Sequence, residues 1–184
     1  MNKPINILVT GCNGRMGKAI INCASNHSEV LITKGIDIGD VLDDHIDDSD
    51  VVIDFSTHAF TTELVGKCAS KDKSIVIGTT GHSDDELLAI KKSAESVPIV
   101  MAPNFSVGVN TLFWLTKKTA EILGEDFDLE VIEMHHRQKI DAPSGTARRL
   151  GEILAESTGV SYSSDIMHGR EGIVGKRTKK EIGM

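Results

Sequence analysis

The chain has 184 residues, of which 40% are hydrophobic and 26% charged, and its formal net charge is −7. The acidic sum argues against a general nucleic-acid binder, because such proteins are usually basic, and the composition is that of a globular rather than a disordered chain. No apolar run approaches the roughly 18 residues of a membrane span, so we expect no membrane partner.

Apolar runs and amphipathic stretches alternate along the first hundred residues. Short apolar runs predict strands at Ile5–Thr10, Val30–Ile36, Val51–Phe55, Ser74–Ile77 and Val97–Met101. Helical spacing of apolar residues predicts helices at Arg15–Ala24, His58–Ala69 and Asp84–Glu95. Strict alternation of this kind indicates an α/β fold with a parallel, doubly wound sheet. We therefore predict a Rossmann-type dinucleotide-binding domain over residues 1–106.

The pattern changes after about Ser106. A long helix is predicted at Gly108–Leu123, a half-exposed strand at Asp128–His135, where polar and apolar residues alternate, and another helix at Ala147–Ser157. The remainder is rich in Gly and Lys. We predict part of a second domain, of α+β type, over residues 107–184, which the family resemblance described below identifies as a partial substrate-binding and oligomerisation domain.

The first predicted strand is followed by three glycines in the spacing G-x-x-G-x-x-G, from Gly11 to Gly17. Glycine lets backbone N–H groups approach a pyrophosphate, and the positive end of the following helix faces the anion. The alternative is a glycine-rich turn without a ligand. The strand–loop–helix context favours a cofactor site made of Gly11, Cys12, Asn13, Gly14, Arg15 and Met16.

Asp37 ends the second predicted strand, about 20 residues after Gly17, where an acidic side chain accepts hydrogen bonds from the adenosine ribose. The alternative is one more aspartate in an acidic stretch, since eight aspartates and no Lys or Arg lie between Gly35 and Asp54. Ile38 follows, so no adjacent cation would neutralise a 2′-phosphate. We predict NADH to be at least as good a cofactor as NADPH, with Arg15 the one nearby cation that would help NADPH.

Two further loops follow predicted strands, at the sheet edge where ligands of parallel sheets bind. Gly78, Thr79 and Thr80 follow the fourth strand, and Ala102, Pro103, Asn104 and Phe105 follow the fifth. Their backbone and polar groups suit a nicotinamide carboxamide, although ordinary turn chemistry accounts for either loop alone. The segment from Asp54 to Thr57 is similarly placed.

A local cluster of basic residues interrupts the acidic chain between His135 and Arg149. His135 and Lys139 come together if the chain turns, and they suit proton donation and the fixing of an anion. Free N–H groups at a helix start near Ser144 suit a carboxylate. A solvated basic turn with Ser144 as a helix cap is the alternative. A metal at His135 and His136 is disfavoured, because adjacent strand histidines point apart and no third ligand is suitably spaced, so we expect no metal.

The three cysteines, Cys12, Cys23 and Cys68, are odd in number and widely spaced. This fits reduced thiols better than a disulfide framework or a zinc site. The N-terminus leads directly into a strand-like stretch without a signal peptide. We therefore expect a cytoplasmic protein.

Several of these motifs together resemble the 4-hydroxy-tetrahydrodipicolinate reductase (dihydrodipicolinate reductase) family. The resemblance rests on the Gly11–Gly17 and Gly78–Gly81 loops, on Ala102–Asn110, and above all on Glu133-x-His-His-Arg-x-Lys139 followed by Asp-Ala-Pro-Ser-Gly-Thr146. It covers the chain from Ile7 to Met184 in motif order.

The resemblance implies a cytoplasmic, tetrameric, NAD(P)H-dependent oxidoreductase of the diaminopimelate route to lysine, acting on a small dicarboxylate. It assigns proton donation to His135, the second catalytic role to Lys139, and substrate binding to His136, Ser144, Gly145 and Thr146. The loops already named hold the cofactor.

The chain departs from the family at its end, since the family continues beyond Met184 with further strands of the substrate domain. We expect a substrate domain truncated at its C-terminus, and a homotetramer for a full-length protein but not for this length. The alternative function is a truncated, non-catalytic NAD(H)-binding module.

Overall fold

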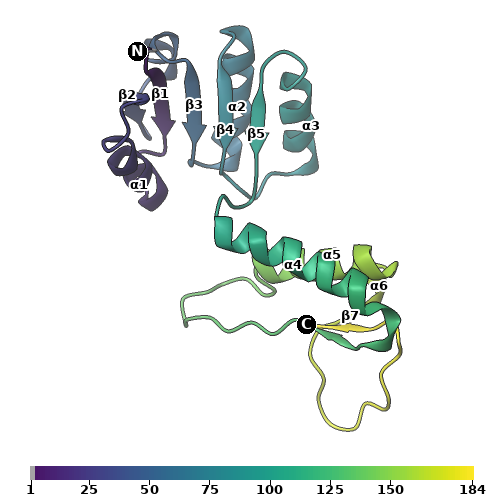
Figure 1. Cartoon of the computed structure of the whole chain (residues 1–184). Helices are drawn as coiled ribbons and strands as arrows, with labels where there is room; N and C mark the ends of the chain where they lie inside the picture. The colour runs from purple at the N-terminus through teal and green to yellow at the C-terminus, as the bar shows by residue number, and fades with distance from the viewer. Residues whose placement is uncertain (1–2) are drawn as a thin grey trace. The chain divides into compact units, whose positions relative to one another are not determined.

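The computed structural model describes residues 3–184, which divide into two compact units (Figure 1). The first ends at Pro103 and the second runs from Asn104 to Met184. The boundary predicted at residue 106 lies just inside the second unit, immediately before its first helix.

A five-stranded parallel sheet forms the centre of the first unit. Its strands are β1 (Ile5–Thr10), β2 (Val30–Ile36), β3 (Val51–Asp54), β4 (Ser74–Ile77) and β5 (Ile99–Met101), in the spatial order β2-β1-β3-β4-β5. From β1 the chain passes to β2 at one edge of the sheet. It then returns to β3 on the other side of β1 and adds β4 and β5 toward the opposite edge. The order of strands therefore reverses between β1 and β3, which is the position where doubly wound sheets bind ligands. The predicted α/β, Rossmann-like fold is confirmed.

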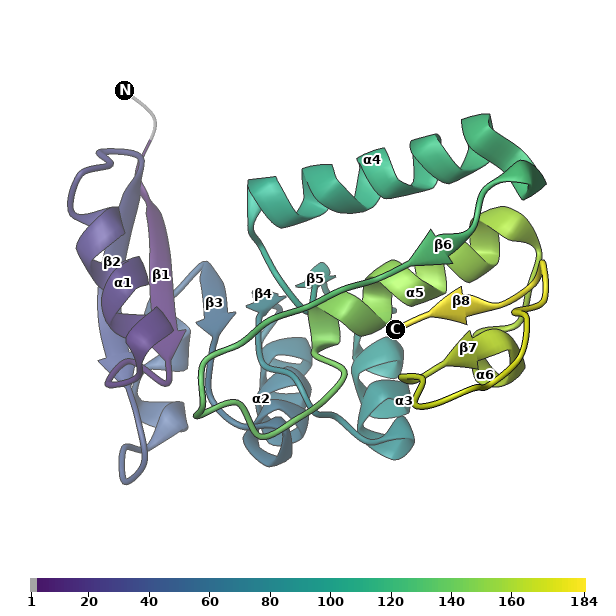
Figure 2. The ribbon, with the colours of Figure 1, turned by 90° about the horizontal axis from the view of Figure 1, so that it is seen from below.

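Three helices connect these strands: α1 (Arg15–Ala24), α2 (His58–Ser70) and α3 (Asp84–Ser93). Helix α1 packs on β1 and β2, whereas α2 and α3 contact each other (Figure 2). Right-handed crossovers running in opposite directions from the centre put α1 on one face and the α2–α3 pair on the other. Helix α3 begins at a capping box, in which Ser83 and Glu86 each accept a backbone N–H of the other residue.

The crossover from β2 to β3 contains no α-helix. Two short 3₁₀ turns, Leu42–Asp44 and Ile46–Asp48, replace it, and their leading apolar residues are buried while the aspartates face outward. The acidic stretch of the sequence is therefore largely a solvated surface, which the buried side chains of Leu42 and Ile46 anchor to the core of the first unit.

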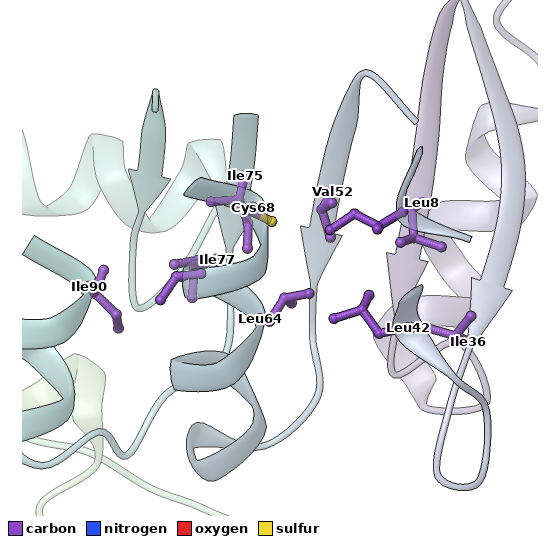
Figure 3. Close-up of a cluster of buried hydrophobic side chains, with 11 residues drawn as sticks. Leu8, Ile36, Leu42, Val52, Leu64, Cys68, Ile75, Ile77 and Ile90 are labelled. Carbon is purple, nitrogen blue, oxygen red and sulfur yellow. The ribbon is translucent and has the colours of Figure 1, made fainter. Parts of the chain in front are cut away.

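The core of the first unit is aliphatic and lies between the sheet and helices α2 and α3 (Figure 3). Leu8, Val52 and Ile75 from the strands meet Leu64 and Cys68 from α2. Burial, and secondarily the charge of Asp54, raises the pKa of the Cys68 thiol to about 12. Cys68 is therefore a neutral core residue and not a nucleophile.

The second unit combines three helices with a small parallel sheet. The helices are α4 (Val107–Leu123), α5 (Gly145–Thr158) and α6 (Tyr162–Asp165), and a 3₁₀ turn at Gly124–Asp126 follows α4. The strands are β6 (Leu129–Glu130), β7 (Ile166–Met167) and β8 (Ile182–Gly183), in the order β6-β8-β7. Ala120, Leu154, Ala155 and Ile182 form the core. None of the helices within residues 3–184 combines the length and apolar character that a membrane crossing needs.

The strand predicted at Asp128–His135 is wrong in extent, because only Leu129 and Glu130 pair with β8. The amide of Val131 still donates to the carbonyl of Gly183 at 2.9 Å, and no partner strand accompanies the chain beyond it. The side chains of this segment still alternate in exposure, as they would in a strand. Val131 is half-buried, whereas Ile132 and Met134 are 87% and 92% exposed. From Ile132 to helix α5 the chain pairs with no strand, and it turns at residues 137–138.

Candidate functional site

A cleft of about 350 Å³ opens at the carboxyl ends of β1, β2 and β3, at the point where the strand order reverses. Its size is at the lower end of the range of ligand pockets, roughly 300–1,000 Å³. The lining residues come from the glycine loop, the end of β2 and the β3–α2 turn: Thr10, Gly11, Gly14, Ile36, Asp37, Ile38, Gly39, Asp40, Phe55, Ser56, Thr57 and Phe60.

The glycine loop is shaped by backbone contacts that exclude side chains. Gly11 has φ +71°, and a Cβ added there would lie 2.2 Å from the Phe55 carbonyl oxygen. A Cβ on Gly17 would lie 2.3 Å from the Gly11 carbonyl oxygen, so helix α1 can approach the loop only through a glycine. Helix α1 has Gly14 as its N-cap, without a side-chain cap and without an acidic residue in its first turn. The amides of Cys12, Asn13 and Gly14 donate to groups within the protein, so the N–H groups of the first turn of α1 and its positive end are what suits an anion.

Asp37 lies in the cleft wall, close to the glycine loop. One of its carboxylate oxygens accepts the amide of Asn13 and the other the amide of Ile38, each at 2.8 Å. These two hydrogen bonds, that from Ile38 first, lower the pKa of Asp37 below its ordinary value. The carboxylate is therefore ionised at neutral pH and keeps lone pairs for further donors.

The charges around Asp37 differ in part from those expected. Asp40 accepts the amide of Asp37 at 2.9 Å and also lines the cleft, so a second carboxylate stands beside the first. The cation whose charge acts on Asp37 is Lys18, one turn further along α1 than Arg15. Arg15 was the one nearby cation predicted from the sequence, whereas Lys18, one helical turn further on, is the cation that acts on Asp37.

The loop after β4 lies against the β3–α2 turn. The amide of Gly78 donates to the carbonyl of Asp54 at 2.8 Å, and a Cβ on Gly78 would lie 2.2 Å from the Phe55 ring. The Thr79 hydroxyl accepts the amide of Ser56 at 3.0 Å, while Thr80 is exposed. Gly78 and Thr79 therefore adjoin the cleft. The β3–α2 turn, which was predicted to lie at the same sheet edge, supplies three of the cleft's lining residues.

The loop after β5 is divided between the two units. The amide of Ala102 donates to the Ile77 carbonyl at 3.2 Å, beside the end of β4, and Pro103 ends the first unit. Asn104 and Phe105 belong to the second unit, where the Asn104 side chain accepts the amide of Ser106 at 3.0 Å just before helix α4.

In the second unit, the chain turns sharply after the two histidines, and the amide of Lys139 donates to the carbonyl of His136 at 3.1 Å. The Lys139 ammonium pairs with Asp141. The pKa of the Asp141 carboxyl is lowered, first by its hydrogen bond from Lys139 and also by the charges of Lys139 and His135. Lys139 and His135 therefore both lie near the Asp141 carboxylate.

Glu133 connects this turn to helix α5. Its Oε1 accepts the amide of Ser144 at 2.9 Å, and its Oε2 is 3.7 Å from Nδ1 of His135. Hydrogen bonding from Ser144, by its hydroxyl first and its amide second, lowers the pKa of Glu133. An ionised Glu133 thus lies beside the His135 ring. Glu133 did not figure among the predicted site residues.

Helix α5 begins directly after this link. The Ser144 side chain is buried and accepts the amide of Ala147 at 3.1 Å, so Ser144 is the helix cap that the sequence allowed as an alternative. A Cβ added to Gly145 would meet no atom within 4 Å, so the space beside the first turn is open. The amides of Gly145 and Thr146 start the helix there, and its first turn holds no acidic residue. Within residues 3–184, no three His, Cys, Asp or Glu side chains are grouped as metal ligands would be.

Comparisons with known proteins agree on one family. The family models described as "Dihydrodipicolinate reductase, N-terminus" and "Dihydrodipicolinate reductase, C-terminus" match residues 5–105 and 108–184. The chain is 52% identical over 180 residues to 4-hydroxy-tetrahydrodipicolinate reductase of Akkermansia muciniphila, covering 98% of this chain and 73% of that protein. It is 42% identical to the enzyme of the same name from Hahella chejuensis, covering 96% and 75%.

A solved structure is also similar. Dipicolinate-bound dihydrodipicolinate reductase from Paenisporosarcina sp. TG-14 aligns with a TM-score of 0.70 and 26% sequence identity, covering 98% of this chain and 77% of that one. The chain thus spans about three-quarters of the length of the proteins it matches.

Proposed function

The chain belongs to the dihydrodipicolinate reductase family, and we propose that it catalyses the reaction for which its relatives are named. This is the NAD(P)H-dependent reduction of the dehydrated form of 4-hydroxy-tetrahydrodipicolinate to tetrahydrodipicolinate, in the diaminopimelate route of lysine biosynthesis. The observation that carries the proposal is the 52% identity to a reductase over 98% of this chain. No observation favours the non-catalytic alternative.

The cleft of the first unit fits a dinucleotide. Gly11 permits close backbone approach to a pyrophosphate, the uncapped start of α1 favours its charge, and the Asp37 carboxylate is available to ribose hydroxyls. The bound cofactor supplies a hydride. The residues that we propose to hold it are Gly11, Cys12, Asn13, Gly14, Arg15, Met16, Asp37, Gly78, Thr79, Thr80, Ala102, Pro103, Asn104 and Phe105.

NADH is the favoured form of the cofactor. A 2′-phosphate beside Asp37 would also meet Asp40, and the intervening Ile38 carries no charge. Lys18 lies close enough to offset part of this repulsion. We therefore propose that NADPH is accepted less well than NADH.

The turn of the second unit suits a small dianion. His135 donates a proton to the ring carbon next to the one that receives the hydride, and Glu133 holds the imidazole ready for that step. Lys139 and His136 supply positive or donor groups for the substrate carboxylates. The amides of Gly145 and Thr146 at the start of α5 provide a second carboxylate site, which the Ser144 cap keeps in place. Assembly of a full-length protein into a homotetramer and a cytoplasmic location are proposed on the resemblance to the family alone.

Turnover with defined variants tests this function. We expect the chain to oxidise NADH in the presence of the dicarboxylate substrate, and His135→Ala combined with Lys139→Ala to lower kcat by about 10²- to 10⁴-fold with little change in the Kd for NADH. His27→Ala, an exposed histidine of the first unit, is the matched control. Near-normal turnover of the double variant would refute the assigned roles. Tight NADH binding by the unmodified chain without any turnover would instead support the binding-module alternative.

A further inference from the structure

A buried carboxylate lies beneath the cleft and has no role so far in binding or catalysis. Asp54 ends strand β3, and its side chain is fully buried. Among residues 3–184 it forms no ion pair with Lys, Arg or His within 4 Å. A buried charge without a cation is costly unless hydrogen bonds replace its lost hydration. The environment of Asp54 therefore consists of donors.

Five hydrogen bonds satisfy the two oxygens of this carboxylate. Oδ1 accepts the Thr10 hydroxyl at 2.6 Å, the Ser56 amide at 3.1 Å, and the Ser56 hydroxyl. Oδ2 accepts the Thr61 hydroxyl at 2.6 Å and the Thr79 hydroxyl at 2.8 Å. These five bonds, all from neutral donors, fill the acceptor capacity of the side chain.

These donors come from the segments that surround the cleft. Thr10 ends β1 directly before the glycine loop, Ser56 lies in the turn that lines the cleft, and Thr79 lies in the loop after β4. Thr61 belongs to helix α2, behind the cleft. Asp54 therefore joins the three loops at the point where the strand order reverses, although they are far apart in the sequence.

The carboxylate also fixes which way each hydroxyl points. The hydroxyls of Thr10, Ser56, Thr61 and Thr79 each donate their single hydrogen to Asp54. The Thr79 oxygen then accepts the Ser56 amide at 3.0 Å. Thr10 and Ser56, which line the cleft, can offer a ligand only lone pairs. Such groups pair with N–H or O–H donors of a ligand and do not pair with phosphate oxygens.

We infer that Asp54 is a positioning residue for the dinucleotide. It holds the glycine loop, the β3–α2 turn and the loop after β4 in one arrangement, and it makes the cleft floor an acceptor for the hydroxyl or carboxamide donors of the cofactor. This inference rests on the proposed use of the cleft by NAD(P)H. Asp54 acts through Thr10, Ser56 and Thr79 and does not touch the reacting atoms.

Asp54→Asn tests the inference, because it keeps the size of the side chain but turns one acceptor into a donor. We expect the Kd for NADH, measured by fluorescence titration, and the KM for NADH to rise about tenfold, with an unchanged KM for the dicarboxylate. A merely destabilised enzyme has fewer active molecules, which lowers apparent kcat and leaves both KM values unchanged. Asp50→Asn is the matched control, since Asp50 accepts the Asn6 amide at 2.8 Å at the opposite end of the same strand.

Thr61→Val tests the same inference if Asp54→Asn does not fold. It removes one donor from behind the carboxylate without touching the cleft lining, and Thr61→Ser restores the hydroxyl. We expect a several-fold rise in the Kd for NADH with Thr61→Val and recovery with Thr61→Ser. Folded variants whose Kd equals that of the unmodified chain would overturn the inference. Failure of the unmodified chain itself to bind NADH would overturn the proposed function, and the inference with it.

Discussion

The backbone amide of Asn13 donates a hydrogen bond to the carboxylate of Asp37 at 2.8 Å. The residue expected to hold the adenosine ribose therefore also holds the tip of the glycine loop. Because the same carboxylate accepts the amide of Ile38, two backbone donors orient it before any ligand arrives. The Asp37 carboxylate thus belongs to both the pyrophosphate part and the ribose part of the proposed site, so a change at Asp37 should affect both parts.

Removal of this charge should weaken cofactor binding. We expect Asp37→Ala to raise the Kd for NADH by about 10- to 100-fold, because it removes charge-assisted hydrogen bonds to the ribose and releases Asn13. Asp37→Asn keeps one acceptor and should have a smaller effect. Fluorescence titration with NADH provides the measurement, and Asp44→Asn, an exposed aspartate of the same acidic stretch, is the control. Unchanged binding by Asp37→Ala would contradict the ribose assignment.

Cofactor preference should respond to the residue after Asp37. The Ile38 side chain is 99% exposed, so an arginine there disturbs no core and brings a guanidinium to the cleft wall. We expect the unmodified chain to have a kcat/KM for NADH at least equal to that for NADPH, and Ile38→Arg to raise kcat/KM for NADPH about tenfold. Ile38→Gln controls for length and polarity without charge. A strong preference of the unmodified chain for NADPH would contradict the proposal.

The first unit could be predicted well because its signals are local. Apolar runs such as Ile5–Thr10 and Val30–Ile36 end at glycine or polar turns, and the structure reproduces their bounds. The β2–β3 crossover was harder to predict, because no helical spacing marks it and its two buried apolar residues, Leu42 and Ile46, stand isolated among aspartates.

The strands of the second unit were harder to predict than its helices, because these strands depend on partners that are distant in the sequence. Leu129 and Glu130 pair with Ile182 and Gly183, and no local pattern indicates a strand of two residues. The role of Asp54 as a shared hydrogen-bond acceptor was not predicted for a related reason. In the run VVIDF it looks like the end of a strand, and its donors are scattered from Thr10 to Thr79. Hydroxyl residues at the ends of successive strands are the one sequence signal that would have indicated them.

Glu133 should be important for turnover although it lies outside the predicted site. Glu133→Gln removes the negative charge that faces His135 and weakens the link to Ser144, so we expect kcat to fall about 10- to 100-fold through misplacement of the imidazole. The Kd for NADH should be unchanged, because Glu133 is not among the residues that we propose to hold the cofactor. Steady-state kinetics measure kcat for both variants and the unmodified chain. Glu171→Gln is the control, since Glu171 is an exposed glutamate of the same unit. Equal kcat values for Glu133→Gln and the unmodified chain would disprove this role.

The capping box of α3 should make stability depend on pH. The Ser83 amide first, and His58 second, lower the pKa of Glu86 from 4.5 to about 2. A carboxyl whose folded pKa is depressed stabilises the fold above its ordinary pKa and loses that contribution as pH falls toward the folded value. We therefore expect Glu86→Gln to lower Tm by a few degrees at neutral pH, and the difference to shrink below about pH 4.5 and vanish near pH 2. Thermal unfolding followed by circular dichroism at several pH values measures this.

Ser83→Ala, which removes the uncharged half of the same capping box, is the control. It should lower Tm by an amount that varies less with pH, since the amide of residue 83 can still donate to Glu86. A Tm difference for Glu86→Gln that stays constant down to the acid limit would show that the charge of Glu86 contributes nothing to the cap.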